Sequence, residues 1–220
     1  MTREPRTKVC CITSLDEARD AIRLGASAVG FVSSMPSGPG VIPEKAIAAI
    51  ASAIPPPIGT FLLTCATSAE AIVAQQRRCR TNTVQLCDYV DSSIYRDLRR
   101  ELPGIALVQV IHVVGPVSVE LARAAAGHVD ALLLDSGDTT SSIKLLGGTG
   151  RTHDWATSRR IREAVPVPVF LAGGLTAANV QEAIAAVQPF GLDVCSGVRT
   201  DSRLDITKLS AFFSALRAVA

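Results

Sequence analysis

The stretch VPVFLAGGLTAANVQEAIAAVQPFGLDV, residues 167–194, contains one complete strand–helix–strand unit. An apolar run over 167–171 is followed by the pair Gly173-Gly174, and a second apolar run begins near Gly191. Between the runs, apolar residues recur at the spacing of one helical face: Val180, Ala183, Ile184 and Val187. Both runs are apolar on both faces, which is typical of parallel strands buried between two layers.

The same alternation extends over the whole chain. Apolar runs begin near Lys8, Ser27, Ile58, Thr83, Ile105, Asp130, Pro168 and Gly191, with Ala-rich amphipathic stretches between them. Alternating strands and helices indicate a parallel sheet with right-handed crossovers, and eight such units close a barrel more naturally than they extend an open sheet. A chain of 220 residues also has the usual length of an undecorated barrel. The sequence therefore predicts the α/β class, with a single (β/α)8 TIM barrel as one domain over residues 1–220.

Two of the expected helices carry recognisable start signals. Ser14 is followed three residues later by Glu17, which predicts a capping box at the start of the first helix. Pro43 precedes Glu44, which places a proline in the first turn of the second helix.

Composition and charge narrow the function classes. The chain has 22 basic and 20 acidic residues without a basic block, which argues against a nucleic-acid partner and leaves room for a small anionic ligand. No apolar run reaches the roughly 20 residues that a membrane span needs, and the polar start lacks the apolar core of a signal peptide. We therefore expect a cytoplasmic protein without membrane contact, and nothing in the sequence indicates an obligatory protein partner.

Six cysteines raise the question of metal binding. They include no CxxC pair and no other spacing typical of a metal site. We expect free thiols in a reducing compartment and no metal.

Glycine clusters follow three consecutive strands. They are Gly147-Gly148-Thr149-Gly150 after the sixth strand, Gly173-Gly174 after the seventh and Ser196-Gly197 after the eighth. Glycines let backbone N–H groups approach a phosphate closely, and barrels often bind phosphate after strands seven and eight. The clusters predict a phosphorylated small-molecule substrate held by Gly147, Gly148, Gly150, Gly173, Gly174, Ser196 and Gly197.

Two residues suited to proton transfer end strands. Cys10 closes the first and Asp135 closes the sixth, at the rim where barrels gather catalytic groups. Cys10 read alone could equally be an inert buried cysteine, and Asp135 could cap the following loop.

An ordered set of motifs spans nearly the whole chain. It comprises Lys8-Val9-Cys10, residues 28–32, Val84-Gln85-Leu86, residues 133–136, residues 147–150, Asp154-Trp155, residues 171–175, Asn179-Val180 and residues 193–198. Together these motifs resemble the phosphoribosylanthranilate isomerase family.

The resemblance implies a (β/α)8 barrel and an Amadori rearrangement in tryptophan biosynthesis, without metal or cofactor. It implies that Asp135 is the general acid and Cys10 the general base. Gln85 and Asp193 fall on substrate-binding positions of the family, and the glycine loops on its phosphate site.

Several positions depart from the family pattern. Gly40 stands where the family carries an arginine that contacts substrate, Cys11 where it carries glycine, Cys87-Asp88 where it carries His-Gly, and Arg199 where it carries glutamate. One hypothesis is that Arg199 binds substrate in place of the lost arginine. Another is that the chain is a paralogue acting on a different N-phosphoribosyl amine. A third is a noncatalytic phosphate-ligand barrel, which the presence of both Cys10 and Asp135 disfavours.

Overall fold

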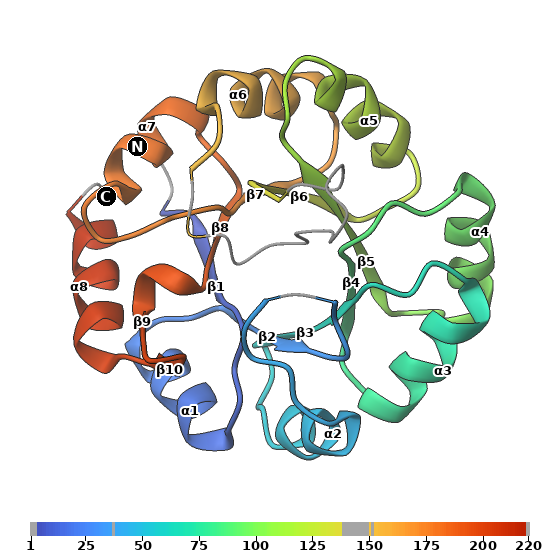
Figure 1. Ribbon diagram of the computed structural model, residues 1–220, viewed down its shortest axis with the longest axis horizontal. Coiled ribbons are helices and arrows are strands. Elements are labelled where there is room, and N and C mark those ends of the chain that lie inside the picture. The colour runs from blue at the N-terminus through green and yellow to red at the C-terminus, as the bar shows by residue number, and fades with distance from the viewer. Residues whose placement is uncertain (1–3, 37, 138–149, 151, 219–220) are drawn as a thin grey trace.

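The computed structural model describes residues 4–36, 38–137, 150 and 152–218. In these residues eight parallel strands close into a barrel, and eight helices form an outer ring around it (Figure 1). The strands are β1 (Arg6–Val9), β2 (Ala28–Val32), β3 (Gly59–Thr64), β4 (Thr83–Leu86), β5 (Ala106–His112), β6 (Ala131–Asp135), β7 (Val169–Leu171) and β8 (Gly191–Val194). The helices are α1 (Leu15–Leu24), α2 (Glu44–Ser52), α3 (Ala69–Cys79), α4 (Ser92–Glu101), α5 (Val117–Ala126), α6 (Trp155–Ala164), α7 (Val180–Val187) and α8 (Ile206–Arg217).

The barrel closes because β1 pairs in parallel with both β2 and β8. Every strand begins within two residues of the position expected from the apolar runs. The prediction of an α/β (β/α)8 barrel is confirmed.

Apolar side chains fill two layers. The larger layer lies between strands and helices and includes Val180, Ala183, Ile184 and Val187 of α7, as their spacing predicts. The smaller layer fills the barrel interior and includes Phe61, Leu133 and Phe170. Within the described ranges, no helix combines the length and apolar character that a membrane crossing requires.

The start of α1 differs in part from the expected capping box. The Ser14 hydroxyl does accept a hydrogen bond from the backbone N–H of Glu17, at 3.2 Å. The Glu17 carboxylate, however, accepts from the backbone N–H groups of Thr13 and Leu204, both at 2.9 Å. It therefore joins α1 to the short antiparallel pair β9 (Arg199–Thr200) and β10 (Arg203–Leu204). At α2 the helix begins at Glu44, so Pro43 is the N-cap residue just before the first turn.

After β8 the chain makes one 3-10 turn, η1 (Ser196–Val198), before it enters β9. This turn brings the chain back over the carboxyl end of β1, where the site described next is located.

Candidate active site

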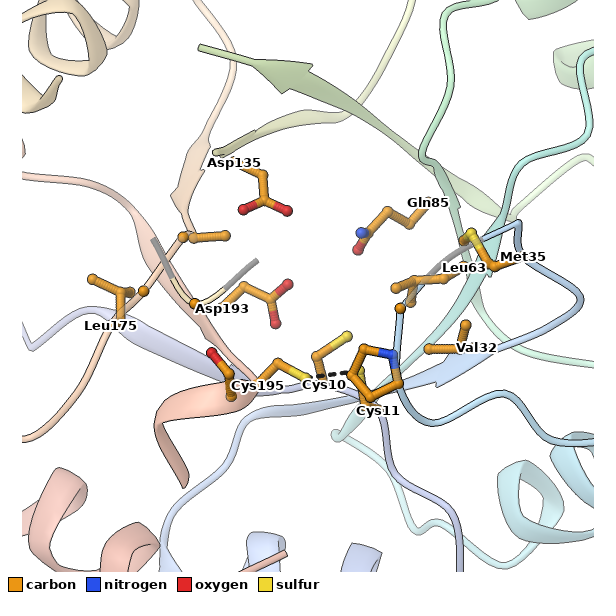
Figure 2. A pocket seen from close by; sticks show the side chains of 17 residues that line it. Cys10, Cys11, Val32, Met35, Leu63, Gln85, Asp135, Leu175, Asp193 and Cys195 are labelled. Atoms are coloured by element: carbon orange, nitrogen blue, oxygen red, sulfur yellow. Dashed lines mark hydrogen bonds between the residues drawn. The ribbon is translucent and has the colours of Figure 1, made fainter. Parts of the chain in front are cut away.

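A cavity opens at the carboxyl ends of the barrel strands. Its lining includes eight of the residues expected from the sequence: Cys10, Gln85, Asp135, Gly150, Gly173, Gly174, Asp193 and Ser196. Figure 2 shows the side chains of Cys10, Gln85, Asp135 and Asp193 entering the same space from different strands. Residues up to 186 positions apart in the chain, Cys10 and Ser196, therefore share one pocket.

The two candidate proton-transfer residues project into this cavity. Cys10 directly follows β1 and is 4% exposed, and Asp135 is the last residue of β6 and is 8% exposed. Asp135 Oδ1 accepts a hydrogen bond from the backbone N–H of Ser136 at 2.7 Å, which fixes the orientation of the carboxyl group. A carboxyl and a thiol that face one cavity can serve as acid and base on the same ligand.

A buried ion pair lies directly below the cavity. Lys8 of β1 is fully buried, and its Nζ lies 2.8 Å from Oδ2 of Asp193, the residue opposite it on β8. Burial acts to lower the pKa of Lys8, but the Asp193 carboxylate and the Cys10 thiol raise it, so the lysine stays protonated. Burial raises the pKa of Asp193, and Lys8 opposes this effect.

The sequence reasoning missed Lys8. The signal was available, because the alternation of a strand puts Lys8 and Cys10 on the same face. Gly30 on the neighbouring strand provides the space, since a Cβ there would lie 2.9 Å from Cε of Lys8. Lys8 thus places a positive charge beside the sulfur of Cys10 inside the barrel.

Two buried acceptor oxygens in the cavity lack a hydrogen-bond partner among the described residues. They are Oε1 of Gln85 and Oδ1 of Asp193. Both side chains point into the cavity in Figure 2. Because burying an acceptor without a donor costs free energy, these oxygens indicate positions where a ligand hydroxyl would bind.

The glycine-rich loops are placed in part as expected. Gly173 and Gly174 line the cavity between β7 and α7, with φ of 85° and 61°, values that favour glycine. Gly150 and Ser196 line it as well. Gly147 and Gly148 lie outside the described residues.

Gly197 is absent from the cavity lining. A Cβ at this position would lie 1.9 Å from the carbonyl oxygen of Leu175, so the glycine allows the loops after β7 and β8 to touch. This packing requires glycine at position 197, and the expected role of Gly197 in phosphate binding stays a prediction.

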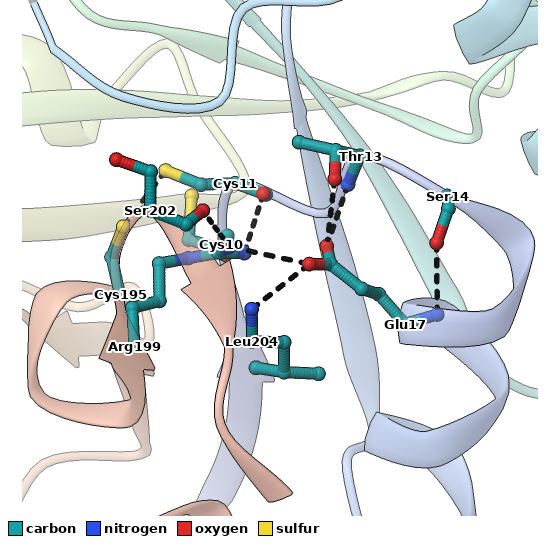
Figure 3. A network of polar contacts seen from close by, with 9 residues as sticks. All are labelled: Cys10, Cys11, Thr13, Ser14, Glu17, Cys195, Arg199, Ser202 and Leu204. Atoms are coloured by element: carbon teal, nitrogen blue, oxygen red, sulfur yellow. Dashed lines mark hydrogen bonds and ion pairs between the residues drawn. The ribbon is translucent and has the colours of Figure 1, made fainter.

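Arg199 is also absent from the cavity lining, and Figure 3 shows its side chain directed at Cys10 and Cys11. Its side chain is 4% exposed and donates to the backbone carbonyl oxygens of Cys10, at 3.0 Å, and Cys11. It also forms an ion pair with Glu17 at 3.5 Å. The η1 turn points this side chain at the backbone of the β1 loop, so we correct the expectation that Arg199 contacts substrate: it holds the segment that carries Cys10.

The position of the missing arginine is closed to any side chain. Gly40 has φ of 80°, and a Cβ there would lie 2.6 Å from Cβ of Cys11. Gly40 and Cys11 both depart from the family pattern, and the two departures are linked. The side chain of Cys11 occupies the space that a side chain at position 40 would need. Cys87, in the place of the family's histidine, is buried and does not line the cavity.

The contacts of Glu17 predict a pH-dependent stability. Burial opposes ionisation, but hydrogen bonds from Leu204 and Thr13 and the charge of Arg199 lower the pKa of Glu17 below its ordinary 4.5. A lowered pKa in the folded state adds stability that is complete above the unfolded pKa and is lost as pH falls through the folded pKa. Glu17→Gln is expected to lower the free energy of unfolding by about 1–3 kcal/mol at pH 7.

Urea unfolding of the wild type and Glu17→Gln between pH 7 and pH 3 measures this difference. The gap is expected to shrink below pH 4.5, the ordinary pKa of the group. Asp16→Asn, at a side chain that is 90% exposed, is the control and should change stability little. A gap that is constant over the whole pH range would contradict the assignment to the Glu17 carboxylate.

Comparison with known proteins identifies related sequences over nearly the whole chain. The sequence model described as N-(5'-phosphoribosyl)anthranilate (PRA) isomerase matches residues 7–215. The N-(5'-phosphoribosyl)anthranilate isomerase of Methanocella arvoryzae is 34% identical over 198 residues, covering 90% of this chain and 91% of that protein. Isomerase 2 of Methanosarcina mazei is 37% identical, covering 88% of this chain and 85% of that protein.

Solved structures agree with the sequence relatives. The phosphoribosyl anthranilate isomerase of Thermotoga maritima superposes with a TM-score of 0.81 at 27% identity, covering 97% of this chain and 99% of that one. The enzyme of Thermus thermophilus gives 0.80 at 27% identity, covering 98% and 100%. Another similar structure (TM-score 0.78, 26% identity, covering 97% and 99%) holds reduced 1-(o-carboxyphenylamino)-1-deoxyribulose 5-phosphate. With a matching family model over nearly its whole length and relatives above 30% identity, this chain belongs to the N-(5'-phosphoribosyl)anthranilate isomerase family.

Proposed function

We propose that this chain converts N-(5'-phosphoribosyl)anthranilate into 1-(o-carboxyphenylamino)-1-deoxyribulose 5-phosphate, the Amadori rearrangement of tryptophan biosynthesis. The observation that carries the proposal is the placement of Cys10 and Asp135 in one cavity with the glycine loops after β7 and β8. Family membership supports the same reaction.

In the first step Asp135 acts as general acid. Its carboxyl group protonates the ring oxygen of the furanose, the C1–O bond breaks, and the ring opens to an iminium at C1. The Ser136 N–H holds one carboxyl oxygen, and the other remains free to face the ligand. A positioned acid contributes about 100- to 10,000-fold to such a step.

In the second step Cys10 acts as general base. The iminium withdraws electrons from C2, so the thiolate of Cys10 can remove the C2 proton and leave an enolamine, which tautomerises to the ketone. Lys8 favours this role because its charge lies beside the sulfur. The iminium itself receives the electron pair, so the chemistry calls for neither metal nor cofactor.

The remaining polar groups suit the rest of the substrate. Gly173, Gly174, Gly150 and Ser196 line the side of the cavity where the loops supply backbone N–H groups for a phosphate. The free acceptor oxygens of Gln85 and Asp193 can accept from ribose hydroxyls. Phosphate binding and hydroxyl contacts are therefore part of the proposal.

The test is a direct assay of the purified protein with N-(5'-phosphoribosyl)anthranilate, followed by the loss of its fluorescence. We expect turnover in the ordinary enzymatic range of about 1–1000 s⁻¹ without added metal, and unchanged turnover after treatment with a chelator. The matching substrate without its phosphate is expected to react poorly, because the loop contacts are lost. A protein that binds the phosphorylated product analogue but turns over no N-(5'-phosphoribosyl)anthranilate contradicts the proposal and favours another N-phosphoribosyl amine.

A further inference from the structure

Two cysteines in the wall of the cavity touch each other. The Sγ atoms of Cys11 and Cys195 share a hydrogen bond and lie 2.8 Å apart (Figure 2). Cys11 comes from the loop after β1 and Cys195 directly follows β8, and both side chains line the cavity. Neither has a role in the isomerisation steps described above.

The backbone holds Cys11 against its partner. Cys11 has φ of 62°, a left-handed conformation that is uncommon for residues other than glycine. Arg199 binds its carbonyl oxygen, and the absence of a side chain at Gly40 leaves space for its Cβ. The Cys11 side chain is therefore fixed in an otherwise unfavourable conformation that directs its sulfur to Cys195.

The surroundings shift the pKa values of the two thiols in opposite directions. The contact with Cys11 lowers the pKa of Cys195, burial opposes this effect, and the charge of Arg199 adds to the lowering. Hydrogen bonds with Cys10 and Cys195, together with burial, raise the pKa of Cys11 well above its ordinary value. Cys195 is therefore the more acidic of the two thiols, and the thiolate that it forms is the nucleophile in thiol–disulfide exchange.

We propose that Cys11 and Cys195 form a reversible disulfide in the wall of the cavity by exchange with a low-molecular-weight disulfide such as oxidised glutathione. The Cys195 thiolate attacks one sulfur of that disulfide, whose S–S bond breaks and releases one thiolate. Cys11 then gives up its proton and attacks Cys195 Sγ, and the second small thiol leaves. The two protein thiols lose two electrons and two protons, and the small disulfide becomes two thiols.

Forming the Cys11–Cys195 disulfide requires little movement, and the disulfide would constrain the loop that carries Cys10. A disulfide has an S–S length of about 2.05 Å, so the two sulfurs need to approach by less than about 1 Å. The link would tie the loop that carries Cys10 to the start of η1, which carries Ser196. Since a misplacement of about 1 Å can cost about 100-fold in rate, we expect oxidation to lower isomerase activity by about 10-fold or more. This consequence rests on the proposed function, whereas the bond itself does not.

The test treats the reduced protein with oxidised glutathione and measures intact mass and cross-linked peptides. We expect a protein lighter by two hydrogen atoms, with position 11 joined to position 195, and full reversal by dithiothreitol. Because Cys10 adjoins Cys11, the same experiment in the Cys10→Ser background identifies the linked residue without ambiguity, and the link should form there as well.

Single variants separate the roles of the two thiols. Cys11→Ser is expected to accumulate a stable glutathione adduct on Cys195, because the second attack is lost. Cys195→Ser is expected to leave Cys11 unmodified, because the nucleophile is lost. Cys65→Ser, a control outside the cavity lining, should form the link as the wild type does.

Three results would decide against the inference. A glutathione adduct on Cys10 alone, or a link from Cys195 to Cys10, overturns the assignment of the pair. Equal adduct formation in Cys11→Ser and Cys195→Ser overturns the division of roles. A fully cross-linked protein with undiminished turnover overturns the effect on catalysis, while failure of the reduced protein to turn over substrate refutes the proposed function and leaves the mass result valid.

Discussion

Asp135→Asn is expected to lower kcat for N-(5'-phosphoribosyl)anthranilate by about 100- to 10,000-fold, because an amide cannot protonate the ring oxygen. The fold should be preserved, since the amide oxygen of asparagine can still accept the hydrogen bond from Ser136. KM should change much less than kcat, because the phosphate and hydroxyl contacts remain. Initial rates over a range of substrate concentrations measure both constants.

A matched control is Asp91→Asn at the N-cap of α4, outside the cavity lining, where asparagine can keep the cap and kcat should be unchanged. Cys10→Ser tests the other half of the pair and should lose kcat to a similar extent, because a hydroxyl is a far weaker base than a thiolate. Its control is Cys79→Ser in α3, which is buried away from the cavity and should affect stability rather than kcat. Near-normal turnover of Asp135→Asn or Cys10→Ser would refute the assigned acid–base roles.

Lys8→Met is expected to destabilise the protein by about 3–5 kcal/mol, the cost of removing one partner from a buried ion pair. The remaining Asp193 carboxylate would be left in the barrel interior without its cation. Because burial raises the pKa of Asp193 above its unfolded value, the carboxyl is favoured in its protonated form at low pH. The deficit should therefore grow as pH rises, which denaturant unfolding at pH 5 and pH 8 can measure.

Two comparisons make the Lys8 experiment decisive. Lys8→Met combined with Asp193→Leu should regain much of the lost stability, because an apolar pair can replace a buried ion pair. Arg23→Met breaks the exposed pair with Asp20 and should cost no more than about 1 kcal/mol. If Lys8→Met costs no more than Arg23→Met, the buried pair does not have the energetic role assigned here.

The barrel itself was predictable from local patterns. Strands buried on both faces appear in the sequence as continuous apolar runs, such as 28–32 and 131–134, and helices start at polar caps such as Ser14. Once the strands close a ring, their carboxyl ends meet at one rim. Residues at strand ends, including Cys10 and Asp135, must then come together.

The contacts of individual side chains were less predictable. Arg199 follows Ser196 and Gly197 closely in sequence, which suggested the cavity, but the η1 turn directs it to Glu17 and to the backbone of Cys11. Apart from the nearby carbonyl oxygen of Ser202, its partners come from the opposite end of the chain, and no local pattern identifies them. Lys8 resembles a surface charge until the register of β1 and β8 sets it opposite Asp193.

The contact between Gly40 and Cys11 restricts the order in which this protein can change. While Cys11 keeps its side chain, any residue with a Cβ at position 40 meets an atom at 2.6 Å, so a single substitution there destabilises the loop whatever it adds to ligand binding. Cys11→Gly would remove that contact, but the backbone Cα and O of residue 11 would still lie at 3.0 Å, and the φ of 80° would still strain any residue other than glycine. An arginine at position 40 thus requires both a smaller residue at position 11 and a changed backbone at position 40, and a library that varies position 40 alone would miss it.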